Sequence, residues 1–202
     1  MVPLFTGSGV AIVTPFTKES VDLPALGKLI DFQLQAGTDA IIVCGTTGES
    51  STMSYYERMK TVDYCISRVE GRVPVIAGSG SNNTENAIAL SRDAEAAGAD
   101  GLLRHYRAIA DMVEIPIILY NVPSRTGVSF TAETYAALAE HPHILGVKEA
   151  SGNFALIQKT RCLCPADFYI WSGNDDETTA ICALGGKGVI SVAANLLPQS
   201  MH

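Results

Sequence analysis

The sequence predicts an α/β fold in which parallel strands alternate with helices and close into a (β/α)8 barrel, also called a TIM barrel. Short apolar runs recur along all 202 residues, and most are continuous, which is typical of strands buried on both faces. Amphipathic segments with helical spacing separate these runs. The first run ends in Thr14-Pro15-Phe16 and not in a glycine-rich turn, which disfavours the alternative, a doubly wound open sheet.

The predicted strands have the length and the near-continuous apolar character of buried parallel strands. In chain order they are Gly9–Phe16, Ala40–Gly45, Pro74–Gly78, Gly101–Leu103, Ile115–Asn121, Ile144–Ala150, Phe168–Gly173 and Gly188–Ala193.

The predicted helices lie between the strands and begin or end at typical capping residues. Thr84 is a plausible N-cap and Gly98 a C-cap glycine for one of them. Another opens at Thr131 and runs to about Glu140. The helical segments are Leu23–Ala36, Ser54–Val69, Thr84–Ala97, Thr131–Glu140, Asn153–Cys162 and Glu177–Leu184, with one more beginning at Arg104.

Two places depart from a complete barrel. The run Gly101–Leu103 passes directly into the helical segment at Arg104, where a full strand and loop need roughly ten to fifteen more residues. After the last strand only Asn195–His202 remains, which is short for an outer helix. We therefore expect one domain, residues 1–202, that lacks the strand-4/helix-4 junction segment and the C-terminal helices and is truncated after strand eight.

Composition narrows the possible partners. The chain is 47% hydrophobic and 17% charged, and no apolar run reaches the length of a membrane span. The net charge of −7 and the absence of a Lys/Arg cluster disfavour nucleic acid binding. The five cysteines and four histidines show no zinc-ligand spacing, and His141-Pro142-His143 is expected to be a solvent-facing turn. The odd number of cysteines predicts reduced thiols, and the N-terminus lacks the basic residues that open a signal peptide, so we expect a cytoplasmic protein. Because no zinc-ligand spacing is present, we expect no metal.

Lys148 is the most informative single residue, because it stands near the end of an otherwise apolar strand. An amine in an apolar wall has a lowered pKa, so that more free amine exists near neutral pH to attack a carbonyl carbon and form a Schiff base. Tyr120, at the end of the preceding predicted strand, can carry the protons of that step. The alternative is a lysine that emerges into solvent past the strand.

Other polar residues at strand ends share the same predicted rim, since parallel strands end on one face of a barrel. Thr46 and Thr47, between glycines, can hold a small carboxylate, and Arg125 can bind a second one with its planar guanidinium. Taken alone, each residue also has a structural explanation. Thr46 and Thr47 would belong to a common turn, Tyr120 would be a core tyrosine, and Arg125 would be a surface charge. Glu149 is expected to fix the local structure, and Gly185–Gly188 to form a turn on the opposite face.

These residues lie in blocks that resemble the signature motifs of dihydrodipicolinate synthase, in the pyruvate-dependent class I aldolase superfamily. The likeness covers almost the whole chain. The blocks are Gly45–Ser50, Tyr120–Gly127 and Val147–Ala150, with further similarity at Gly9–Phe16 and Gly188–Val192.

The resemblance implies a Schiff-base lyase that condenses pyruvate with aspartate 4-semialdehyde in lysine biosynthesis. Lys148 would form the Schiff base, Tyr120 would exchange protons, and Thr46 would belong to the proton relay. Thr47 would hold the pyruvate carboxylate and Arg125 the semialdehyde carboxylate. The backbone at Gly173 and Ile190 would line the pyruvate pocket. It further implies no cofactor, since the lysine is the electron sink, and self-association as a homotetramer or dimer.

Two alternatives remain open at this stage. One is N-acetylneuraminate lyase or another 2-keto acid aldolase of the superfamily, against which Arg125 argues. The other is a catalytically impaired remnant or fragment, because the family's Tyr-Tyr-Asn segment after strand four has no counterpart here.

Overall fold

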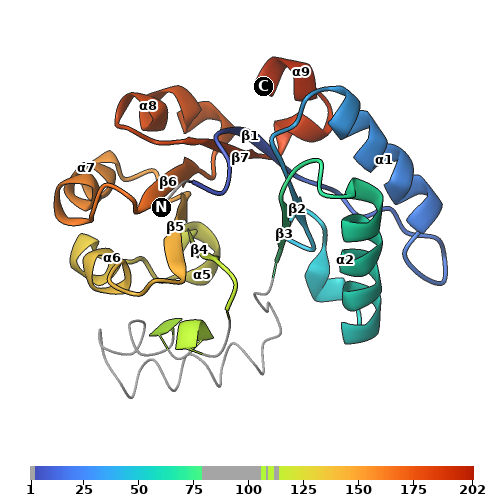
Figure 1. Ribbon diagram of the computed structural model, residues 1–202, viewed down its shortest axis with the longest axis horizontal. Helices are drawn as coiled ribbons and strands as arrows, with labels where there is room; N and C mark the ends of the chain where they lie inside the picture. Colours follow the sequence, from blue (N-terminus) through green and yellow to red (C-terminus); the bar gives the residue numbers. More distant parts are fainter. Residues whose placement is uncertain (1–2, 79–105, 108, 112–113) are drawn as a thin grey trace. The chain divides into compact units, whose positions relative to one another are not determined.

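The computed structural model describes residues 3–78, 106–107, 109–111 and 114–202 (Figure 1). The chain forms two compact units: residues 4–83 with 189–202, here the first unit, and residues 84–188 with 1–3, here the second unit. Both are built from strands alternating with helices. The predicted helix Thr84–Ala97 and the predicted strand Gly101–Leu103 lie outside the described residues.

The first unit contains strands in the order β3-β2-β1-β7. Pairing is parallel between β1 and β2 and between β2 and β3, with Val10 opposite Ile41 and Ile41 opposite Val75. The strands are β1 (Gly7–Ala11), β2 (Ala40–Val43), β3 (Val75–Ala77) and β7 (Gly188–Ser191). Almost every residue of β1, β2 and β7 is buried, as expected for strands covered on both faces.

Helices α1 (Leu23–Gln35) and α2 (Tyr55–Val69) lie side by side over the strands of the first unit (Figure 1). Asp22 caps α1 by accepting a hydrogen bond from Ala25 N, and the fully buried Leu26 and Ile30 point into the core. The core also contains Val10, Ile12, Ile41, Val43, Cys65 and Val69.

Residues after β7 fold back onto β1. The short elements are η3 (Ala193–Asn195) and α9 (Pro198–Met201). The Asn195 amide donates to Ala11 O at 2.7 Å and accepts from Val13 N at 3.0 Å, so this side chain continues the hydrogen bonding of β1 past its last residue. The predicted strand Gly9–Phe16 therefore ends earlier than expected, at Ala11.

The second unit contains strands in the order β6-β5-β4, all parallel. They are β4 (Ile117–Asn121), β5 (Ile144–Glu149) and β6 (Tyr169–Ser172). The helices are α5 (Pro123–Thr126), α6 (Ala132–Leu138), α7 (Phe154–Leu163) and α8 (Thr178–Ala183), with η2 (Asp175–Glu177) before α8. Helices α6 and α7 lie side by side (Figure 1).

One face of these strands packs on the helices and forms the core of the second unit. Leu119, Val147 and Ile170, one from each strand, meet Tyr135 of α6 and Ile157 of α7 there. Because side chains alternate along a strand, Tyr120, Lys148 and Trp171 lie on the other face. The register pairs Lys148 with Tyr120 on one side and with Trp171 on the other.

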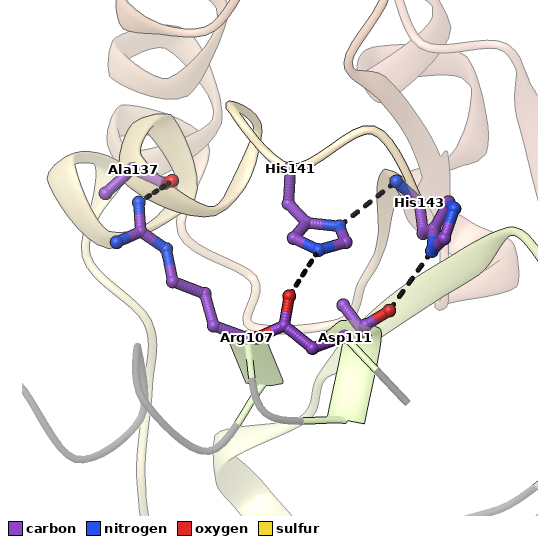
Figure 2. Close-up of polar contacts among 6 residues, drawn as sticks. Arg107, Asp111, Ala137, His141 and His143 are labelled. Carbon is purple, nitrogen blue, oxygen red and sulfur yellow. Dashed lines mark hydrogen bonds and ion pairs between the residues drawn. The ribbon is translucent and has the colours of Figure 1, made fainter. Parts of the chain in front are cut away.

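Helical residues 106–107 and 109–111 are tied by polar contacts to the end of α6 and to the segment between α6 and β5 (Figure 2). His141 Nε2 lies 3.1 Å from the Asp111 carboxylate, His143 Nδ1 lies 3.1 Å from Ala110 O, and Arg107 donates to Ala137 O at 2.9 Å. The predicted turn forms at residues 141–143, but it is not wholly solvent-facing: the His141 side chain is 15% exposed, because its ring contacts this helix.

Candidate active site

The lysine singled out by the sequence stands one residue before the end of β5. Its Nζ lies 4.5 Å from the ring centroid of Tyr120, so the amine and the phenol occupy the same face of the β4–β5 pair. Trp171, fully buried, is its partner in β6. The lysine therefore has an aromatic residue opposite it on each neighbouring strand, and its own side chain is half-buried.

This environment lowers the pKa of Lys148 to about 8. Burial is the main cause, because it penalises the charged ammonium, and the positive charge of Arg125 acts in the same direction. The carboxylate of Asp175 acts in the opposite direction and retains part of the ammonium form. A substantial fraction of the amine is thus free at slightly alkaline pH, which is the reactive form.

The pKa of Tyr120 is raised, also mainly by burial, and the charge of Arg125 counteracts part of that rise. The phenol therefore keeps its proton near neutral pH. A protonated phenol beside a free amine can donate a proton to a carbonyl oxygen as the amine attacks the carbon.

Gly173 follows β6 and lies against the stem of Lys148. A Cβ atom at this position would stand 3.1 Å from Lys148 Cε and 2.7 Å from Ala150 Cβ. Any side chain here would force Ala150 or the lysine stem to shift, so the residue is glycine for reasons of space.

Arg125 lies in α5, the short helix that leaves β4 and ends at Gly127 with a φ of 71°. Pro123 occupies the first turn, where it restricts the backbone. Arg125 is exposed, and it is close enough to lower the pKa of Lys148. Its guanidinium is thus available to an anion that approaches the lysine from solvent.

Thr46, Thr47 and Ile190 belong to the first unit. Thr46 is exposed and Thr47 half-buried, in the loop after β2, while Ile190 is buried in β7. The loop is fixed by Thr14 Oγ1, which donates to Gly48 O at 2.8 Å. A Cβ atom at Gly48 would lie 3.1 Å from Ile12 O, so this turn packs tightly against the end of β1.

A buried polar network beside the lysine was only partly anticipated. Glu149 was expected to fix local structure, but its partners Asn121 and Tyr135 were not identified as members of the site. Asn121 Nδ2 lies 3.0 Å from Glu149 Oε1, and the Tyr135 hydroxyl donates to Glu149 Oε2 at 2.9 Å. One signal was available: Asn121 follows Tyr120 just as Glu149 follows Lys148.

Among the residues that the structure describes, no group of three or more His, Cys, Asp or Glu side chains is arranged to hold a metal ion. None of the helices in these ranges combines the length and the apolar character that crossing a bilayer would need.

A lysine and a tyrosine are paired across the carboxyl ends of two parallel strands, an arrangement suited to the carbonyl chemistry of an α/β lyase. Residues 4–202 match the model of the dihydrodipicolinate synthetase family. The chain belongs to this family, which is a family of lyases.

Curated relatives agree with the family match. The chain is 50% identical over 217 residues to the 4-hydroxy-tetrahydrodipicolinate synthase of Caldicellulosiruptor saccharolyticus, covering 100% of this chain and 73% of the relative. The synthase of Thermoanaerobacter sp. (strain X514) is 48% identical with the same coverage. Because 217 positions are matched by only 202 residues, these relatives carry residues inside the matched stretch that this chain does not have.

Solved structures support the fold class. The dihydrodipicolinate synthase of Thermotoga maritima matches with a TM-score of 0.88 and 40% identity over 98% of this chain and 74% of its own. The enzyme from Aquifex aeolicus gives the same score and identity, with 73% of its chain covered. A further match, also at 0.88 and 40%, is described as a monomeric dihydrodipicolinate synthase variant, with 98% and 72% covered. The predicted fold class, the (β/α)8 barrel of this family, is confirmed.

Proposed function

We propose that this chain is a Schiff-base lyase that condenses pyruvate with aspartate 4-semialdehyde to 4-hydroxy-tetrahydrodipicolinate. The observation that carries the proposal is the position of Lys148, with its Nζ over the Tyr120 ring and its pKa lowered to about 8. The names of the relatives, 4-hydroxy-tetrahydrodipicolinate synthase at close to 50% identity, supply the substrates.

The chemistry follows from a free amine beside a protonated phenol. The Lys148 amine forms a C–N bond to the keto carbon of pyruvate, and the keto oxygen, after taking up protons, leaves as water. The resulting Schiff base withdraws electrons, so that the methyl group loses a proton and the enamine attacks the aldehyde carbon of the second substrate. Tyr120 gives and receives the protons of these steps, and the amino group of the second substrate then attacks the Schiff-base carbon, which closes the ring and releases the Lys148 amine.

The remaining residues have roles in binding and proton transfer. Thr46 belongs to the proton relay, and Thr47 holds the carboxylate of pyruvate. Arg125 binds the carboxylate of the semialdehyde, for which its planar fork is suited. The backbone at Gly173 and Ile190 lines the pyruvate pocket. No metal or organic cofactor takes part in this scheme.

Borohydride trapping tests the proposal directly. Incubation with pyruvate and borohydride should add the mass of one reduced pyruvate adduct, located on Lys148 by peptide mapping. Lys148→Ala should abolish the adduct. Lys187→Ala is a matched control, since Lys187 Nζ also faces a tyrosine ring, 6.0 Å from the centroid of Tyr169. An unmodified Lys148 in protein shown to be folded would refute the proposal.

The pH dependence of trapping provides a second test. Since only the free amine attacks, the rate of adduct formation should rise with pH, reach half its maximum near pH 8, and level off about one unit above. A rate that still rises tenfold per pH unit at pH 9.5 would mean that Lys148 titrates like an ordinary surface lysine.

Turnover assays separate this proposal from its alternatives. Cyclised product from pyruvate and aspartate 4-semialdehyde, with no cleavage of sialic acid, supports the synthase and argues against N-acetylneuraminate lyase. Adduct formation without product would indicate an impaired remnant that retains the lysine but lacks part of the proton relay.

The same proposal extends to assembly, location and domain structure. We infer a homotetramer or dimer in the cytoplasm, with residues 1–202 forming a single barrel domain. Because one similar structure is described as a monomeric variant, sedimentation velocity is the measurement that tests the inferred self-association. A monomer at micromolar concentration would contradict the inferred self-association.

A further inference from the structure

Glu149 follows Lys148 in the sequence. Its carboxylate is buried on the opposite face of the sheet. It is 1% exposed and receives three kinds of donor. Asn121 Nδ2 lies 3.0 and 3.2 Å from its two oxygens, the Tyr135 hydroxyl 2.9 Å from Oε2, and Ser151 N 2.9 Å from Oε1. All three groups donate, and both oxygens of Glu149 serve as acceptors.

Burying such a group is costly unless its partners compensate. Among the residues that the structure describes, no ion pair joins Glu149 to a lysine or arginine, and its partners are neutral. An apolar pair could fill the same space without that cost. We therefore expect the buried carboxylate of Glu149 to have a role other than general stability.

The strand register relates Glu149 to the reacting pair. Tyr120 is opposite Lys148, and Asn121 is opposite Glu149, as two successive pairs of the β4–β5 ladder. The Asn121–Glu149 contact is thus a side-chain cross-link one residue beyond Tyr120 and Lys148. It fixes the two strand ends, and with them the distance between phenol and amine.

Asn121 also closes the loop that carries Arg125. Its Nδ2 donates to Ser129 Oγ at 3.3 Å, and its Oδ1 accepts from Phe130 N at 3.4 Å. The loop of residues 122–129, which includes α5, therefore begins next to Asn121 and has its far end hydrogen-bonded to the Asn121 side chain. Since Arg125 contributes to the lowered pKa of Lys148, the placement of this loop affects the amine.

We propose that Glu149 is a positioning residue: through Asn121 it holds Tyr120 and the Arg125 loop in place relative to Lys148 without touching either substrate. This inference rests on the proposed Schiff-base function. It differs from a purely structural role, which would affect stability but leave the reactivity of Lys148 in the folded protein unchanged.

The test compares Glu149→Gln with Tyr135→Phe. Glu149→Gln turns one acceptor into a donor that faces the Asn121 amide and breaks the cross-link, whereas Tyr135→Phe removes a donor from the same carboxylate but leaves the cross-link. Both should lower the melting temperature. Only Glu149→Gln should slow borohydride-trapped adduct formation, by about tenfold or more, and raise KM for the semialdehyde several-fold.

A readout without substrate completes the test. Competitive labelling of Lys148 by an amine-reactive reagent across pH should show its midpoint displaced by about half a unit or more in Glu149→Gln, and unchanged within error in Tyr135→Phe. Asn121→Ala, which breaks the cross-link from the other strand, should behave like Glu149→Gln and carries the test if that variant does not fold.

The outcomes are distinguishable. If the wild type forms the adduct and Glu149→Gln or Asn121→Ala forms it at the same rate with the same labelling midpoint, the positioning role is overturned while the proposed function stands. If all variants, Tyr135→Phe included, lose rate in proportion to stability, the role is structural and the proposal is overturned. If the wild type itself forms no adduct, the proposed function fails and this inference with it.

Discussion

Lys148 is held where its charged form is unfavourable, and this must cost the folded protein stability. Its pKa falls from 10.5 to about 8 because burial penalises the ammonium and Arg125 repels it. The unfolded chain has no such environment, so it binds the proton more tightly than the folded protein does. Reactivity and stability are thus in opposition at this residue.

Replacement of Lys148 by the similarly shaped methionine should therefore stabilise the protein at pH 7, by up to about 3 kcal/mol. The sign follows from proton binding: below pH 8 the cost of the buried ammonium is fully present, and between pH 8 and 10.5 it is relieved, because the folded state releases its proton first. Urea denaturation of wild type and variant across pH 7–10.5 measures the difference. A variant that is less stable at pH 7, or a difference independent of pH, would contradict this account.

Sequence reasoning was effective for residues whose role is set by neighbours in the chain and less so for those set by contacts across the fold. Lys148 stood out because a charge interrupts an apolar strand. Tyr135 did not, because an aromatic residue on a helix looks like ordinary core, and only the packing of α6 on β5 brings its hydroxyl to Glu149. His141 was misjudged for the same reason, since its partner Asp111 lies 30 residues away.

At the scale of elements, helix starts were predictable because capping is local. Ser54, Thr131 and Asn153 each begin a helix as expected, and each accepts a hydrogen bond from a backbone N–H in the first turn. Strand ends were less predictable, because they depend on partners. The strand β1 stops at Ala11 although the apolar run continues, since Asn195, from the other end of the chain, takes over the hydrogen bonds beyond it.

The start of α2 offers a test of this local control. Ser54 Oγ accepts from Glu57 N at 3.2 Å, and the Glu57 carboxylate accepts from Ser54 N at 2.9 Å, forming a capping box. Ser54→Ala should lower the free energy of unfolding by about 1 kcal/mol, whereas Ser54→Thr, which keeps the hydroxyl, should change it by less than about half of that. Equal losses in both variants, measured by denaturant titration, would show that the cap does not stabilise α2.

At the scale of the whole molecule, the alternation of strands and helices was sufficient to predict the fold class, because buried parallel strands require covering helices. The expected shortfall of residues also has support, since relatives match 217 positions to the 202 residues of this chain. Its expected place, between Leu103 and Arg104, lies outside the described residues. Sequence alone could not show that the chain forms two compact units, because compactness depends on contacts between distant segments.

The prediction of a single domain can be tested by cooperativity. Trp171, the only tryptophan, is fully buried in the second unit, so its fluorescence reports that unit, whereas far-UV circular dichroism reports all helices. If residues 1–202 fold as one domain, both signals should give the same midpoint. Leu26→Ala, in the core of the first unit, should then lower the Trp171 midpoint as well, since removal of such a buried side chain costs about 2–5 kcal/mol. Separate midpoints, or a fluorescence transition that Leu26→Ala leaves unchanged, would mean that the two units unfold independently and that the single-domain prediction is wrong.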